Sequence, residues 1–99
     1  MEAGFIKKAL SKLLSEKIIA NSDAEFVNSE LENWTDEQTM DEAVEIFIFA
    51  LDNCGSVDTQ LLINDLKSRQ RNLRGVTNPS ENCLASLELY GKVEARLVG

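Results

Sequence analysis

The sequence predicts an all-α fold: one domain over residues 1–99, formed by a small bundle of about five helices. Three observations support this prediction. Apolar side chains recur three and four residues apart in several segments, which is the helical period. Residues that cap helices precede these segments, and glycines follow two of them. The stretch from Met40 to Leu51 is the most apolar in the chain, and so apolar a helix is normally central.

The first predicted helix spans about Glu2 to Ile19. Its apolar side chains fall in two adjacent rows at four-residue spacing, and the lysines lie outside this stripe. A basic amphipathic helix can also lie on a membrane surface, but here no tryptophan anchors it and the whole protein is anionic. We therefore expect a core helix with a solvated lysine face.

The second predicted helix runs from about Asp23 to Trp34 and is opened by a capping box of Ser22 and Glu25. Its apolar side chains Val27, Leu31 and Trp34 repeat at helical spacing. The connection to the next helix is short, so we expect a sharp corner between the two.

The central helix contains Met40 to Leu51. Thr35 and Gln38 form a capping-box pattern at its start, and Gly55 stands just past its end. A buried strand over residues 44–51 is the alternative, because isoleucine and phenylalanine are good strand formers.

The last two predicted helices are set apart by Gly75. The fourth starts at Ser56 or Asp58 and runs to about Arg74. The fifth has Asn78 as its N-cap, with proline at its first position and a glutamate closing the box. Gly91 lies on the apolar stripe of this helix, which indicates close approach of another backbone.

The charge is distributed unevenly along the chain. The net charge is −7, yet residues 1–17 and 67–99 are each net positive. Residues 18–66 carry twelve acids and no lysine or arginine. A block of this length without a cation is unusual and is the strongest functional indication in the sequence.

Several chemistries find no support in the sequence. Without histidine there is no His-based catalytic triad or His-ligated metal site, and Cys54 and Cys83 are too few for a thiolate zinc site. No nucleotide-binding glycine motif occurs. We expect no enzymatic activity, no cofactor and no metal. The basic cluster of residues 67–74 contains no interleaved aromatic side chain, and the overall charge repels phosphate, so we expect no direct nucleic-acid binding.

We also expect a soluble, cytoplasmic protein. No segment approaches the roughly 18 consecutive apolar residues of a membrane helix, and lysines and serines interrupt the apolar residues of the N-terminus, unlike a signal peptide. The two cysteines lie far apart without motif spacing, which is typical of reduced thiols.

One short segment, Gly55-Ser56-Val57-Asp58-Thr59-Gln60-Leu61-Leu62, resembles the phosphopantetheine attachment site of acyl carrier proteins, which are also small, acidic and helical. The resemblance implies that Ser56 would carry the prosthetic group at the start of a helix. The sequence departs from that pattern at Gly55, where an acid normally stands, and at Val57, where leucine is usual. A serine that opens a helix is far more often simply an N-cap.

The favoured hypothesis is a module that binds a basic protein partner through its acidic middle. In profile it is similar to bacterial immunity proteins, to phage inhibitors of host defence or transcription and to nucleic-acid mimics, and its partner would be a toxin, a nuclease or a host nucleic-acid-binding protein. We expect aromatic anchors to supply affinity and acids to speed encounter. The predicted anchors are Trp34 and Phe49, and the predicted acids are Glu30, Glu37, Asp41, Glu42, Glu45 and Asp52.

Two alternatives remain open. In the first, Phe49 packs beneath a neighbouring helix and the acids only keep the protein soluble. In the second, the basic ends of one copy meet the acidic middle of the next, which would make the protein a homo-oligomeric assembly or scaffold.

Overall fold

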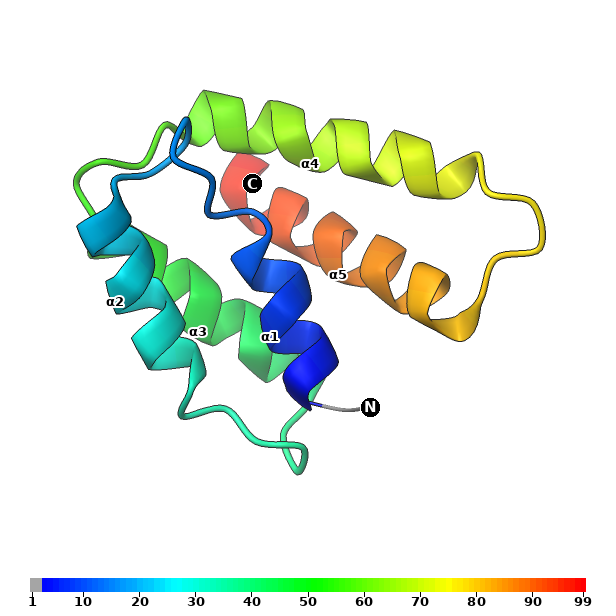
Figure 1. The fold of residues 1–99 in the computed structure, drawn as a ribbon, viewed down its shortest axis with the longest axis horizontal. Coiled ribbons are helices and arrows are strands. Elements are labelled where there is room, and N and C mark those ends of the chain that lie inside the picture. The colour runs from blue at the N-terminus through cyan, green and yellow to red at the C-terminus, as the bar shows by residue number, and fades with distance from the viewer. Residues whose placement is uncertain (1–2) are drawn as a thin grey trace.

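The computed structural model describes residues 3–99, and within them it contains five helices and no strand (Figure 1). The helices are α1 (Ala3–Ser11), α2 (Asn21–Leu31), α3 (Met40–Asp52), α4 (Thr59–Arg74) and α5 (Glu81–Val98). The predicted all-α bundle is therefore confirmed, and residues 44–51 are helix rather than strand. The radius of gyration of the Cα atoms is 12.9 Å, close to the roughly 13 Å of a compact chain of 100 residues.

α3 is the central helix. It packs against α2 and α5, and α1 also contacts it. α4 and α5 form an antiparallel hairpin along one side of the molecule, and α5 is the member that packs on α3 (Figure 1). The buried residues of α3 are Ala43, Val44, Phe47, Ile48, Ala50 and Leu51. Among the described residues, no helix has the length and apolar character needed to cross a membrane.

α1 is much shorter than predicted. It ends at Ser11 instead of Ile19, and Glu2, its predicted first residue, lies outside the described residues. The backbone N–H of Leu13 donates to the carbonyl of Leu10, three residues back, so the chain leaves the helix in a tight turn.

Tertiary packing explains this early end. Ile18 and Ile19 are both buried after the turn, although neighbouring residues on one straight helix point about 100° apart. The carbonyl of Ile18 accepts a hydrogen bond of 2.7 Å from the backbone N–H of Asp58. The bent chain thus covers the core with both isoleucines and joins the start of α4.

The start of α2 also differs from the prediction. The helix begins at Asn21, and no side chain caps its first turn, so the predicted box of Ser22 and Glu25 does not form. The helix ends at Leu31, before Trp34. Aspartate in the first turn still complements the positive end of the helix dipole.

The capping box of α3 lies four residues later than predicted. Thr39 is the N-cap, and its hydroxyl oxygen accepts from the backbone N–H of Glu42 at 3.2 Å. The side-chain oxygen of Gln38 does accept from the backbone N–H of Thr35 at 2.9 Å, but this closes a separate turn. Thr35 and Thr39 are each followed by Gln or Glu at the third position, and only Thr39 stands directly before the apolar run.

The N-cap of α4 is one of the two predicted residues, whereas the N-cap of α5 is not the predicted one. Asp58 caps α4 as one of the two predicted residues, with its carboxylate accepting from the backbone N–H of Leu61 at 3.0 Å. The N-cap of α5 is Ser80 and not Asn78, because Ser80 accepts from the backbone N–H of Cys83 at 3.1 Å. Asn78 has a φ of 53°, a left-handed turn conformation that asparagine tolerates.

Gly91 does not approach another backbone as predicted. A Cβ at this position would meet the side-chain oxygen of Gln70, on α4, at 3.4 Å. Gln70 is 5% exposed, and its amide nitrogen donates to the carboxylate of Glu94 at 2.6 Å. A buried polar side chain therefore crosses between α4 and α5.

We expect Gly91→Ala to raise the free energy of unfolding by about 0.5–1 kcal/mol, because alanine loses less backbone entropy in a helix than glycine does. The new Cβ would lie 3.4 Å from the side-chain oxygen of Gln70, at the short end of van der Waals contact, and a small shift of the Gln70 side chain relieves it. Urea unfolding monitored by circular dichroism measures the change. Gly4→Ala is the control, since a Cβ there meets nothing within 4 Å. A loss of stability in Gly91→Ala alone would show that Gln70 cannot move.

Candidate protein-binding face

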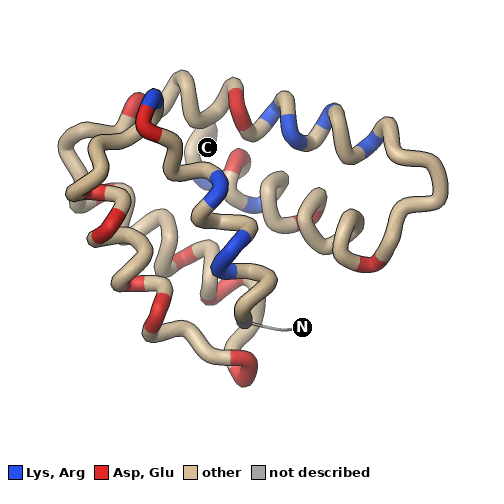
Figure 2. Tube along the Cα trace, in the orientation of Figure 1, with Lys and Arg blue, Asp and Glu red and all other residues tan. Residues whose placement is uncertain are grey.

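Acidic side chains gather on α2, on α3 and on the loop between them. Figure 2 shows Asp and Glu along these elements, whereas Lys and Arg lie along α1, α4 and α5. The uneven distribution of charge along the sequence thus places most of the acids and most of the basic residues on different helices. We call the predicted set without Trp34 the acidic face; it consists of Glu30, Glu37, Asp41, Glu42, Glu45, Phe49 and Asp52.

Phe49 is the most exposed large apolar side chain of the described residues. Its exposed fraction is 66%, while its neighbours Ile48 and Ala50 are buried. On a helix of 3.6 residues per turn, Phe49 shares its side with Glu45 and Asp52, four residues before it and three after it. The apolar sides of α3 face its neighbouring helices, so Phe49 occupies the strip that is left to solvent.

Trp34 is not part of this face. Its side chain is 2% exposed, and its indole nitrogen donates to the carbonyl of Thr39 at 3.2 Å. The expectation that Trp34 is a surface anchor is therefore wrong, and the helical spacing with Val27 and Leu31 correctly indicated the core instead. Sequence reasoning overlooked Phe26, which is 39% exposed on α2 although it stands beside the buried row.

Two acids of the face pair with α5. The ammonium of Lys92 lies 2.7 Å from a carboxylate oxygen of Asp41, and the guanidinium of Arg96 contacts the carboxylate of Glu45. These side chains remain mostly in solvent, with exposed fractions of 74% for Asp41 and 62% for Glu45. Exposed ion pairs contribute only about 0–1 kcal/mol each, so they neutralise charge more than they stabilise the fold.

Glu42 has a structural role at the start of α3. Its carboxylate accepts from the side-chain amide of Gln38 at 3.0 Å, and its backbone N–H is capped by Thr39. Glu42 therefore holds the loop before α3 to the helix. Replacing it would disturb the helix end as well as the surface charge.

Three acids of the face remain without a partner among the described residues. No ion pair or side-chain hydrogen bond involves Glu30, Glu37 or Asp52 within residues 3–99. Glu37 and Asp52 are exposed, and Glu30 is half-buried. Their carboxylates and the Phe49 ring are the parts of the face that are free to meet another molecule.

The side chain of Ser56 forms hydrogen bonds with two residues near the start of α2. Its hydroxyl donates to the carboxylate of Asp23, and its oxygen accepts from the backbone N–H of Ala20 at 3.0 Å. The N-cap of α4 is Asp58, two residues further on. The hydroxyl that would carry a prosthetic group is thus engaged in joining the start of α2 to the loop before α4.

Possible metal ligands do not cluster within the described part of the chain. No group of three or more histidine, cysteine, aspartate or glutamate side chains in residues 3–99 is placed to hold a metal ion. No protein family, curated protein or solved structure matches this chain. Any function must therefore be argued from the chain's own residues.

Cys54 lies close to Asp23, the residue that accepts the hydrogen bond from Ser56. Its thiol donates to the carbonyl of Ala50 at 3.3 Å. Burial raises the pKa of this thiol, and the nearby Asp23 carboxylate raises it further, because both disfavour the thiolate. The ordinary value is 9.0.

We expect Cys54 to react slowly with an aromatic disulfide reagent near pH 8, and its rate to rise at higher pH than that of a free thiol, because the thiolate is the nucleophile. The Cys83→Ser variant leaves Cys54 as the single thiol, and the same variant in urea is the control. The raised pKa also adds stability that is present below pH 9.0 and is lost as the pH rises through the folded-state pKa. Equal rates in the folded and unfolded chain would contradict this shift.

Proposed function

We propose that this chain is a protein-binding module that presents the acidic face to a basic protein partner, in the manner of an inhibitor or of an immunity or anti-defence protein. One observation carries the proposal: Phe49 is 66% exposed on the solvent strip of the central helix, among carboxylates. Covering a phenylalanine side chain is worth about 1.5–3 kcal/mol, and buried aromatic side chains are frequent hot spots of interfaces.

The charges determine the kind of partner. The free carboxylates of Glu30, Glu37 and Asp52 attract a cationic surface and repel an anionic one. We therefore propose a basic protein, such as a toxin, a nuclease or a nucleic-acid-binding protein of the host, and neither nucleic acid nor a membrane. The cytoplasm suits both the proposed partners and the free thiols of Cys54 and Cys83.

Affinity capture from the source organism tests the proposal directly. Wild-type protein and the Phe49→Ala variant serve as paired baits, and mass spectrometry identifies what each retains. We expect a basic protein that is enriched on the wild type and reduced on Phe49→Ala. Capture of the same proteins by both baits, or only of acidic ones, would contradict the proposal.

Phe49→Ala should raise the dissociation rate of the captured partner by about tenfold or more, because the lost aromatic contact acts mainly after docking. Surface plasmon resonance measures the rate. Leu84→Ala is the matched control, since Leu84 is also an exposed apolar side chain, at 52%, but lies on α5. Equal effects of the two substitutions would rule out Phe49 as the anchor.

The double variant Glu37→Lys, Asp52→Lys should lower the association rate by about threefold to tenfold at low salt and leave the dissociation rate nearly unchanged. Both side chains are exposed and free within residues 3–99, unlike those of Glu42 and Glu45. Glu16→Lys with Glu88→Lys is the control, because it makes the same change in net charge elsewhere. An association rate that falls equally in both double variants would mean that only the total charge matters.

Self-assembly is the second candidate function. The separation of acidic α2 and α3 from the basic side chains of α1 and α4 favours it, because the two regions of different copies complement each other (Figure 2). Contacts between unlike surfaces lead to rings or filaments. Sedimentation at low and moderate salt separates the candidates: a discrete oligomer supports assembly, and a monomer near 11.0 kDa supports the binding module.

A further inference from the structure

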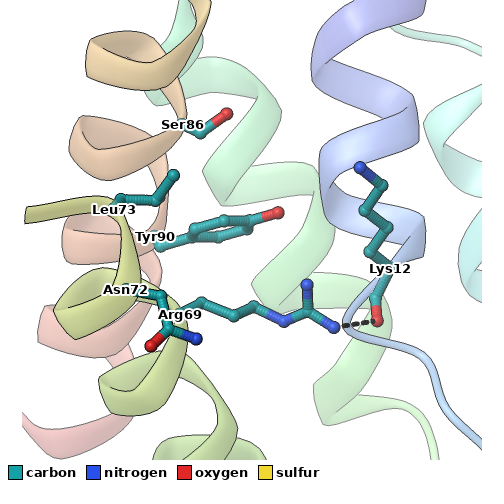
Figure 3. A pocket seen from close by; sticks show the side chains of 6 residues that line it. All are labelled: Lys12, Arg69, Asn72, Leu73, Ser86 and Tyr90. Carbon is teal, nitrogen blue, oxygen red and sulfur yellow. Dashed lines mark hydrogen bonds between the residues drawn. The ribbon is translucent and has the colours of Figure 1, made fainter. Parts of the chain in front are cut away.

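A pocket of about 230 Å³ opens on the side of the molecule formed by α1, α4 and α5. It lies where the chain leaves α1 and meets the α4–α5 hairpin (Figure 3). None of its residues belongs to the acidic face. The lining residues are Lys12, Arg69, Asn72, Leu73, Ser86 and Tyr90.

Two side chains fix the walls of this pocket. The hydroxyl of Tyr90 donates to the carbonyl of Ala9 at 3.1 Å, and the guanidinium of Arg69 donates to the carbonyl of Lys12 at 3.1 Å. Arg69 also pairs with Asp65 at 2.8 Å, and its guanidinium carbon lies 6.0 Å from the centre of the Tyr90 ring. These contacts join α4 and α5 to the end of α1, so the pocket is formed before any ligand arrives.

Three polar side chains of the pocket are unused. Within residues 3–99, no hydrogen bond or ion pair engages the ammonium of Lys12, the hydroxyl of Ser86 or the side-chain amide of Asn72. Figure 3 shows Ser86 and Lys12 on opposite sides of the space beside the Tyr90 ring. Each of the three groups can donate a hydrogen bond.

The charge of the pocket is opposite to that of the protein. Lys12 and Arg69 bring two cations to the wall, and Asp65 balances one of them, in a chain of net charge −7. Tyr90 is only 4% exposed, so Leu73 and the small exposed part of Tyr90 supply a limited apolar surface next to Lys12. A cationic donor beside a small apolar surface favours a ligand that has an anionic head and a small apolar body.

We propose that this pocket binds a small organic anion, a carboxylate or phosphate monoester that bears a single ring. The anionic head lies between Lys12 and Ser86, which donate to its oxygens, and the ring packs against Leu73 and the small exposed part of Tyr90. The volume is below the roughly 300–1,000 Å³ of pockets that hold drug-sized ligands, which limits the ligand to the size of a small metabolite.

Titrations monitored by two-dimensional ¹⁵N–¹H NMR test the proposal with four probes: phenyl phosphate, benzoate, inorganic phosphate and benzyl alcohol. Each is added up to about 10 mM, which covers the millimolar dissociation constants expected for ligands of this size. We expect saturable shifts at the amides of Asn72, Ser86 and Tyr90 with phenyl phosphate or benzoate, and much weaker ones with the other two. The stronger of the two ring-bearing anions identifies the head group as phosphate or carboxylate.

Variants of the unused donors locate the site. Lys12→Glu should weaken binding of the preferred probe by about tenfold or more, because it replaces the free cation by an anion. Lys17→Glu is the matched control and should bind like the wild type, since Lys17 lies outside the pocket. Ser86→Ala should weaken binding by about threefold and keep the helix intact.

Three results would overturn the proposal: no saturable shift at the pocket with any probe, binding that Lys12→Glu leaves unchanged, or inorganic phosphate or benzyl alcohol binding as well as the ring-bearing anions. The spectra of the free variants show whether each is folded. The test does not involve Phe49 or the acids, so its outcome is independent of the proposed protein partner.

Discussion

The burial of α3 is the constraint on which the rest of this structure depends. Its side chains are apolar over most of the helix circumference, so the other helices must cover it on several sides. α2, α5 and α1 provide that cover, and α4 completes the hairpin that holds α5 in place. A single strip of α3 stays in solvent. The exposure of Phe49 therefore results from which side the neighbours leave open, and a polar residue there would serve the fold equally well.

The ion pairs show how α5 is placed on α3. Lys92 and Arg96 stand four residues apart on α5, and they meet Asp41 and Glu45, which stand four residues apart on α3. Matching spacings of this kind give two helices one preferred register. Asp41 and Glu45 are thus partly neutralised by the chain itself, whereas Glu37 and Asp52 have no partner within residues 3–99. Of the acids on α3, Asp41 and Glu45 face α5, whereas Asp52 remains available to another molecule.

Much of the fold could be predicted from sequence, because apolar spacing and helix ends depend on local chemistry. The central helix, the Asp58 cap and the end of the fourth helix at Gly75 all follow from residues a few positions apart. The misplaced caps of α3 and α5 are local errors, whereas two other errors are due to contacts made over long sequence distances. α1 stops at Ser11 because the following chain bends to meet Asp58, and the pairing of Gln70 with Glu94 joins two helices. No local pattern contains that information.

The candidate site shows the same division between local and distant information. The alternation of Phe49 with acids along one helix placed it correctly on the surface, while Trp34 was assigned by its residue type and not by its spacing with buried neighbours. The pocket beside Tyr90 could not be predicted, because its residues come from three segments that are brought together by hydrogen bonds to two backbone carbonyls. The carbonyls of Ala9 and Lys12 can accept these hydrogen bonds because α1 ends at Ser11. In a longer helix both would accept from backbone N–H groups four residues further on, so the pocket depends on the short first helix.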